Sequence, residues 1–186
     1  MYMKDMGKKI ISFALALVMM ISILPVEALA IDAAGSRGSN TPRWIIDEVA
    51  YPVTGGNIYF DRSDGSIRRA DKSITEVVIP EMIDGIKVRM IDSGAFTNCI
   101  HLKNIVIPNS IQRIQDTAFT RCEKLETVVI PEGVAYIGDY VFQYCTNLKS
   151  IYLPKSLKEF GGGSFYNCSN FKDIYYLKKS MKQRIV

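Results

Sequence analysis

Four cysteines and a single histidine are the residues of this sequence with the greatest capacity for chemistry. Cysteine can form disulfides, bind zinc or act as a nucleophile, and histidine can serve as a general base. His101 stands between a cysteine and a leucine, and no serine or carboxylate accompanies it in a recognisable catalytic pattern. We therefore interpret it as an exposed turn residue. The cysteines recur at a constant interval of 23 residues, at Cys99, Cys122, Cys145 and Cys168.

The constant interval decides between the possible roles of the cysteines. Equivalent residues of stacked repeats form a line, whereas zinc needs a tetrahedron of ligands. Four cysteines in an exported protein also suggest two disulfides. Stacked residues lie about 5 Å apart, within reach of a bridge, but their side chains point in parallel. We expect a ladder of free, buried thiols that behave as small apolar side chains.

Other motifs with possible chemistry fit structural explanations. Asp61-x-x-Asp64-Gly65 lacks the alternating ligands and closing glutamate of a calcium loop, so it is interpreted as a turn. The run 161–163 is three glycines without phosphate-loop spacing, and it replaces the corner of a repeat. The 19 acidic residues form no distinctive glycosidase pair. The sequence therefore predicts no catalytic residue, no metal site and no cofactor, with a carbohydrate-directed enzyme kept as an alternative.

The cysteine interval is the period of a longer repeat. A phenylalanine precedes each cysteine by three residues, and a proline recurs at the same interval. One unit reads Leu-x-x-Ile-x-Ile-Pro at residues 102–108, followed by Ala-Phe-x-x-Cys at residues 118–122. The alternation in the first half predicts a strand, and the apolar spacing in the second half predicts a short helical turn. One unit is too small to bury its own apolar face, so stacking must complete the core.

This pattern resembles the BspA-like leucine-rich repeat family, whose unit reads roughly Leu-x-x-Ile-x-Ile-Pro-x-x-Val-x-x-Ile-Gly-x-x-Ala-Phe-x-x-Cys. Residues 123–145 match it closely, including Val134, Ile137 and Gly138. The resemblance covers about residues 56–177. It implies a right-handed leucine-rich-repeat solenoid with a strand and a short helical turn per repeat and a parallel concave β-sheet. It also implies a secreted or surface location and roles in adhesion and protein binding.

Both ends of the repeat region depart from its period. Upstream, residues 58–67 predict an N-terminal β-hairpin cap, over which Trp44 and Tyr51 are expected to pack. An insertion at residues 83–86 contains Asp-Gly, which predicts a tight turn. Downstream, residues 172–176 begin a further strand whose repeat is incomplete. Its C-terminal edge is available for self-association.

The first thirty residues have the pattern of a secretory signal peptide. Two lysines precede an apolar run of 15 residues, and Ala28-Leu29-Ala30 places small residues at the cleavage site. The run is shorter than the roughly 20 residues of a membrane-spanning helix. We expect cleavage near Ala30, no transmembrane segment in the mature form, and a secreted, extracellular or cell-surface location. The predicted organisation is a signal peptide (1–30), an N-terminal linker or cap (31–55), a leucine-rich repeat domain (56–177) and a basic C-terminal tail (178–186).

The net charge of +4 lies almost wholly in that tail. The last nine residues carry +4 and the first thirty +1, which leaves −1 for residues 31–177. A nearly neutral body gives no argument for nucleic-acid binding. The tail is expected to support a salt-sensitive association. Its basic residues are Lys178, Lys179, Lys182 and Arg184.

Strand alternation also predicts a binding face. If Ile105 and Ile107 point into the core, Asn104 and Val106 point outward, and the same holds for every repeat. This gives two columns on the concave face, a polar one and an apolar one that becomes aromatic towards the C-terminus. Such columns suit a protein interface, although cross-strand pairing alone would also favour them. The polar column is Glu76, Asn104, Thr127, Ser150 and Asp173, and the apolar column is Val78, Val106, Val129, Tyr152 and Tyr175.

These observations together predict a secreted or cell-surface binding module and not an enzyme. It would mediate protein–protein interaction or adhesion through its concave face, with an extracellular protein or cell-surface component as partner. Five strands about 4.8 Å apart span only about 20 Å, so that face alone would bind weakly. The alternative is a structural module that self-associates through its C-terminal edge and has no separate ligand.

Overall fold

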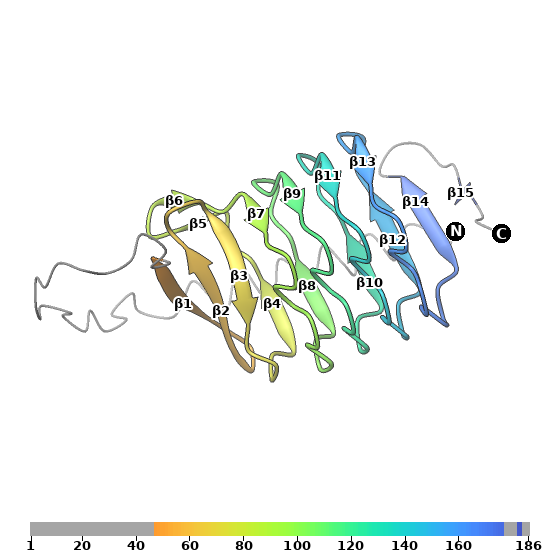
Figure 1. Cartoon of the computed structure of the whole chain (residues 1–186), viewed down its shortest axis with the longest axis horizontal. Coiled ribbons are helices and arrows are strands. Elements are labelled where there is room, and N and C mark those ends of the chain that lie inside the picture. The colour runs from red at the N-terminus through yellow and green to blue at the C-terminus, as the bar shows by residue number, and fades with distance from the viewer. Residues whose placement is uncertain (1–46, 177–181, 184–186) are drawn as a thin grey trace, which may run out of the picture. The chain divides into compact units, whose positions relative to one another are not determined.

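The computed structural model describes residues 47–176 and 182–183, and this part of the chain forms a β-solenoid (Figure 1). By its internal contacts the chain divides into two units, Met1–Ile45 and Ile46–Val186, and every described residue belongs to the second. The predicted signal peptide and Trp44 lie outside the described residues.

The first strand of each coil comes from the Leu-x-x-Ile-x-Ile part of the repeat. Its central residue, such as Ile105 or Val128, is buried, while the residues on either side face outward. Where the first strands of successive coils pair, they pair in parallel, as with Val128 opposite Ile151. These strands are β4 (Glu76–Val78), β8 (Asn104–Val106), β10 (Thr127–Val129), β12 (Ser150–Leu153) and β14 (Asp173–Tyr176), and β15 (Lys182–Gln183) adds antiparallel to β14.

This parallel ladder is interrupted in the middle of the solenoid. Strand β4 pairs with β8, and β10 pairs through β12 with β14, but within the described residues no ladder joins β8 to β10. Both strands have three residues, so the few hydrogen bonds between them are lost with a small separation of the coils. The single concave sheet predicted from the sequence therefore forms as two sheets in one stack.

A second strand per coil was not predicted from the sequence. It comes from the segment after the proline, where Arg113-Ile114 pairs in parallel with Tyr136-Ile137 of the next coil. A strand of two residues is too short to show alternation in a sequence. These strands are β7 (Met90–Ile91), β9 (Arg113–Ile114), β11 (Tyr136–Ile137) and β13 (Glu159–Phe160), and they belong to a seven-stranded sheet.

The predicted helical turn at Ala-Phe-x-x-Cys is wrong, since the described residues contain no helix. The amide of Phe96 donates to the carbonyl oxygen of Ala118 in the next coil at 2.8 Å, and that of Asn98 donates to Thr120 at 2.9 Å. These amides therefore link coils and do not bond along a helix axis. Asn98 also has a left-handed backbone, with φ of 61°, which ends any right-handed turn.

The N-terminal cap is the hairpin predicted from the sequence with one more strand. Strands β2 (Gly56–Asp61) and β3 (Ser66–Ala70) pair antiparallel, which confirms the hairpin, and β1 (Glu48–Val53) pairs with β2 on its other side. Tyr51 of β1 is half-buried against the core, as expected. Strand β3 then pairs in parallel with β7, so the cap and the second strands of the coils form one sheet.

The insertion in the first coil forms a second small hairpin. Strands β5 (Met82–Ile83) and β6 (Ile86–Lys87) pair antiparallel around Asp84-Gly85, and both turn residues have positive φ. The tight turn predicted from Asp-Gly is therefore confirmed.

The interior of the solenoid consists of columns of equivalent residues. The rings of Phe96 and Phe119 stack with centroids 5.1 Å apart, those of Phe119 and Phe142 at 5.6 Å, and those of Phe142 and Phe165 at 6.1 Å. The two ring planes of each pair are within 10° of parallel, so one apolar column runs through four coils and holds the outward-facing columns in register.

Candidate functional site

The four cysteines form a buried ladder of free thiols, which confirms the prediction from their interval. Each thiol donates to a backbone carbonyl oxygen of the preceding coil. The Sγ atoms of Cys122, Cys145 and Cys168 lie 3.2, 3.1 and 3.0 Å from the carbonyl oxygens of Phe96, Phe119 and Phe142. Burial raises the pKa of Cys99 to about 11 and that of Cys168 to about 12. Because the nucleophilic and metal-binding form is the thiolate, this ladder is structural.

The remaining chemical candidates lie apart from one another. His101 is exposed, and in the described part of the chain it has no hydrogen bond to a serine or a carboxylate. Among those residues no group of three or more histidine, cysteine or acidic side chains is placed to hold a metal ion. The same residues include no helix long and apolar enough to cross a membrane.

The Asp61–Asp64 turn is organised by an arginine and not by a cation. The buried carboxylate of Asp61 accepts hydrogen bonds from the Ser63 amide and hydroxyl, and Arg68 donates to Asp61, Asp64 and Asp92. Burial by itself would raise the pKa of Asp61, but the hydrogen bonds from Ser63 and Arg68 lower it overall. This network ties the cap to the first coil.

The polar column of the predicted face is assembled as two short stretches. Asn104 lies opposite Glu76, and its Nδ2 donates to Glu76 Oε1 at 3.2 Å. In the other sheet Ser150 lies between Thr127 and Asp173, and its hydroxyl is 3.4 Å from that of Thr127. Ser150 was predicted to face the partner, but it is only 9% exposed, because its short side chain is covered by those neighbours.

The apolar column is most developed at its C-terminal end. Val78 lies opposite Val106, and Val129, Tyr152 and Tyr175 lie opposite one another along the other sheet. The two tyrosine rings stack with centroids 4.8 Å apart and planes 18° from parallel.

The hydroxyl group of Tyr175 links this column to the polar one. It donates to Asp173 Oδ2 at 3.0 Å. Partial burial and the Asp173 carboxylate raise the pKa of both Tyr152 and Tyr175, so both hydroxyl groups stay protonated and able to donate. The two predicted columns therefore meet at β12 and β14.

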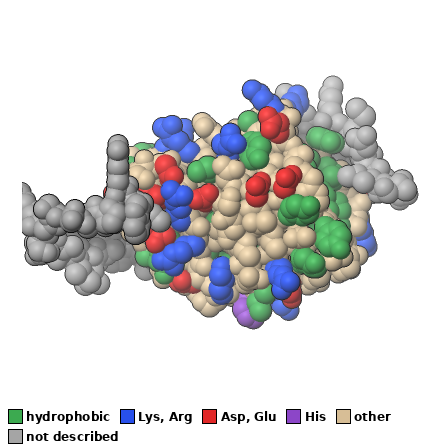
Figure 2. Space-filling view, viewed as in Figure 1, with side chains coloured by type: hydrophobic (Ala, Val, Ile, Leu, Met, Phe, Trp, Pro, Cys, Tyr) green, Lys and Arg blue, Asp and Glu red, His purple; other side chains and the backbone are tan. Residues whose placement is uncertain are grey.

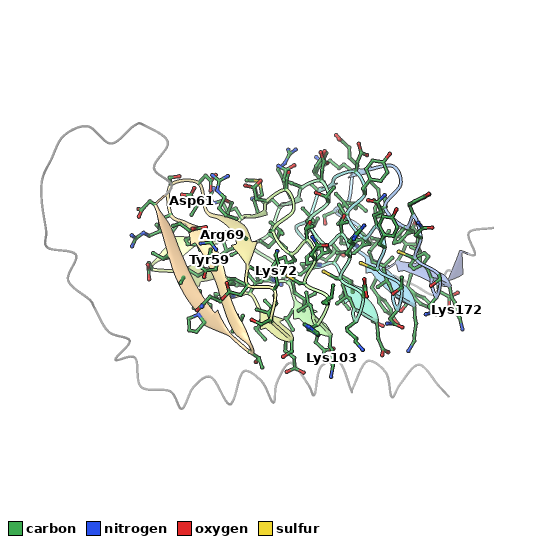
Figure 3. The ribbon with its side chains drawn as sticks, turned by 60° about the horizontal axis from the view of Figure 1, so that its bottom comes forward. Tyr59, Asp61, Arg69, Lys72, Lys103 and Lys172 are labelled. Carbon is green, nitrogen blue, oxygen red and sulfur yellow. The ribbon has the colours of Figure 1, made fainter. Side chains whose placement is uncertain are left out.

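A basic stripe beside the polar column was missed in the sequence. Lys103, Lys149 and Lys172 are exposed and directly precede β8, β12 and β14; Figure 3 labels Lys103 and Lys172 beside their strands. Lys149 forms an ion pair with Glu126 at 2.6 Å. The signal was present as the residue after each repeat leucine, or after Phe171 in the last copy, but glutamate interrupts the lysines in one coil.

The structure describes only part of the basic tail. Lys182 belongs to β15 and lies opposite Tyr175, so the tail returns to the strand that carries the aromatic end of the apolar column. Lys178, Lys179 and Arg184 lie outside the described residues.

Solved structures share this fold. A leucine-rich repeat protein of T. pallidum is 26% identical with a TM-score of 0.52, covering 72% of this chain and 70% of its own. One from Bacteroides capillosus is 23% identical with a TM-score of 0.58, covering 69% and 99%. A leucine rich cell surface protein from Faecalibacterium prausnitzii is 23% identical with a TM-score of 0.53; the match covers 66% of this chain but only 38% of that protein.

No curated protein matches the chain. Residues 69–183, more than half of the sequence, match the family model described as BspA type Leucine rich repeat region, in six copies. The 23-residue period, the coils and this match agree, and the chain belongs to the BspA-type leucine-rich repeat family.

Proposed function

We propose that this chain is a secreted or cell-surface binding module whose outward strand columns contact a partner protein, without catalysis. The observation that carries the proposal is the stacked pair of Tyr152 and Tyr175 beside the carboxylate of Asp173. Tyrosine is enriched in protein interfaces, where a rigid ring loses little entropy and the hydroxyl still finds a hydrogen-bond partner. The name of the F. prausnitzii structure, a cell surface protein, supports the same location, as does the signal-peptide pattern ending near Ala30.

Three parallel stripes define what the partner offers. The lysines before β8, β12 and β14 would meet acidic groups, the polar column would meet hydrogen-bonding groups, and the tyrosines would enter an apolar recess. The face is small compared with the roughly 800 Å² per partner of a standard interface. A second contact is therefore needed, and the basic tail, which returns beside β14, would supply it.

The aromatic end of the face can be tested by removing both rings. The chain would be immobilised and exposed to extracellular-matrix and cell-surface extracts, beside the double variant Tyr152→Ser, Tyr175→Ser. The control is Tyr144→Asn, Tyr166→Ser, which removes another contacting ring pair, with centroids 5.9 Å apart, on a different part of the surface. Asparagine is chosen at 144 because the backbone φ there is 60°.

We expect the first variant to lose more than about tenfold in retention of the partner and the control to keep it, with both folded by circular dichroism. If the two variants retain the partner equally well, the strand columns are not the binding site.

The contribution of the basic tail to partner binding can be measured separately through its dependence on salt concentration. Replacing Lys178, Lys179, Lys182 and Arg184 with glutamine should weaken retention at low salt and remove most of its salt dependence, because exposed charges are screened within about 10 Å at 0.1 M. A salt dependence unchanged in the glutamine variant would show that the tail takes no part.

Self-association is the second candidate function. It is favoured by an apolar hollow of about 620 Å³ beside β13, whose walls include Leu157, Phe160 and Phe165. The edge of β14, through which self-association was predicted from the sequence, is already paired with β15, whereas β13 is the last strand of the seven-stranded sheet within the described residues. Light scattering distinguishes the two functions: a monomer at tens of micromolar would reject self-association, whereas an oligomer dispersed by Tyr176→Ser, a change at an exposed residue of the same hollow, would favour it.

A further inference from the structure

A second hollow lies on the seven-stranded sheet, away from the strand columns of the proposed interface. It has a volume of about 350 Å³ and lies between β11 and β13. Its volume falls within the range of small-molecule sites. The residues that line it are Tyr136, Ile137, Asp139, Glu159, Phe160 and Gly161.

The glycine run of the last complete repeat explains why the surface is hollowed at this corner. Gly161 packs directly on the backbone of Gly138, where a Cβ would lie 2.3 Å from its carbonyl carbon. At Gly163 the space of a side chain is filled by the ring of Tyr140, since a Cβ there would lie 2.3 Å from Cε1. The corner thus has no side chains of its own and holds a tyrosine from the preceding coil.

Tyr140 does not line the hollow itself, but it offers an exposed aromatic surface one residue along the chain from Asp139, which does. It directly follows Asp139, it packs on one side against Gly163, and 47% of it is exposed. Figure 2 shows hydrophobic side chains, in green, gathered towards the C-terminal end of the face in view, with acidic side chains beside them. An exposed ring of this kind attracts C–H groups, which carry a partial positive charge, to its negative face.

The carboxylates of the hollow set the polarity of its ligand. Asp139 is oriented by the amide of Gly162, which donates to its Oδ1 at 2.7 Å. In the described part of the chain neither Asp139 nor Glu159 takes part in an ion pair. Arg113 lies over the ring of Tyr136, another residue of the hollow, at 4.3 Å. Two carboxylates repel phosphates and acidic sugars, and they accept hydrogen bonds from hydroxyl groups.

We propose that this corner binds an uncharged pyranose sugar of an extracellular glycan. The C–H face of the sugar stacks on Tyr140, and its hydroxyl groups donate to Asp139 and Glu159. The sugar site shares no residue with the strand columns, so a negative result for one proposal leaves the other unaffected.

Saturation-transfer NMR on the full chain tests the site with three soluble probes. These are oligomers of N-acetylglucosamine, which are neutral, of glucosamine, which are cationic, and of galacturonic acid, which are anionic. The variants are Tyr140→Asn, which keeps a residue suited to the φ of 55°, and the pair Asp139→Asn, Glu159→Gln. The control is Tyr166→Ser, which removes the more exposed tyrosine without touching the hollow.

The expected result is saturable transfer to the neutral oligomer and none to the anionic one. Binding should fall about tenfold in Tyr140→Asn and in the double variant, and should persist in Tyr166→Ser. The proposal is overturned if the neutral oligomer shows no saturable transfer, if only the glucosamine oligomer binds, or if Tyr140→Asn binds as well as the unmodified chain. Chemical-shift dispersion of each variant shows that it is folded, so loss of binding cannot be mistaken for loss of structure.

Discussion

At the scale of single residues, the cysteines show how burial decides chemistry. A thiol with a pKa of about 11, as at Cys99, is ionised at pH 8 in only about one molecule in a thousand. We therefore expect that a thiol reagent at pH 8 labels no cysteine of the folded protein within minutes. After denaturation without reductant it should label all four. Fewer than four labelled thiols would reveal a disulfide and contradict the ladder.

Asp61 gives a prediction for the acidic range, because its pKa is lowered in the folded protein whereas that of Cys99 is raised. Its pKa is lowered in the folded protein, so the unfolded chain takes up a proton first as the pH falls. The stabilisation is complete above the unfolded value of about 3.9 and is lost as the pH drops through the folded value. Urea unfolding between pH 6 and 3 should show stability falling less steeply in Asp61→Asn than in the unmodified chain. An identical slope would mean that Asp61 is not a source of the acid sensitivity.

At the scale of elements, the corner glycines differ in the space around them: Gly161 is closely packed and Gly162 is not. A Cβ at Gly161 would lie 2.3 Å from backbone atoms of Gly138, whereas at Gly162 its nearest atom is Asp139 Oδ1 at 3.8 Å. Gly161→Ala should therefore push two coils apart and cost about 1–3 kcal/mol, while Gly162→Ala should be neutral or slightly stabilising. Thermal unfolding of both variants checks this, and equal melting temperatures would show that the coils adjust.

The strands differ in how far the sequence predicts them, for a physical reason. Ile105 and Val128 lie in segments long enough to alternate, so their strands and the outward columns were predicted. Arg113-Ile114 is too short to show a period. Ala118-Phe119 has helical spacing, but the amide of Phe119 donates to Val141 of the next coil, and a sequence does not show to which coil an amide donates.

The candidate sites also divide into those that the sequence predicts and those that it does not. Tyr152 and Tyr175 were found because equivalent repeat positions stack, and their ring contact confirms that they meet. Lys103 and Lys172 were missed because a glutamate interrupts their column. The hollow near Tyr140 forms at the glycine run, whose residues have no side chains. From the sequence alone, that run predicts only a loosened corner of the repeat.

At the scale of the whole solenoid, the interrupted ladder makes protection uneven within one coil. Strand β11 is paired on both sides, by β9 and β13, and β12 is likewise paired on both sides, by β10 and β14. Strand β10 pairs with β12 alone, although its central Val128 is fully buried. In a repeat stack, stability comes from the coil and its nearest neighbours, so a missing ladder weakens the junction between the two halves.

Hydrogen exchange measures that junction directly. Amides of β10 should exchange faster than those of β11, although both strands belong to one coil, and faster than those of β12, its neighbour in the same sheet. The comparison with β12 controls for strand type, and the comparison with β11 controls for position along the stack. Equal protection of all three would mean that β8 and β10 pair in solution and that the strand columns form one continuous face. Faster exchange of β10 would place a flexible junction between the valine end of the face and its tyrosine end, so a rigid partner would engage the tyrosine end alone.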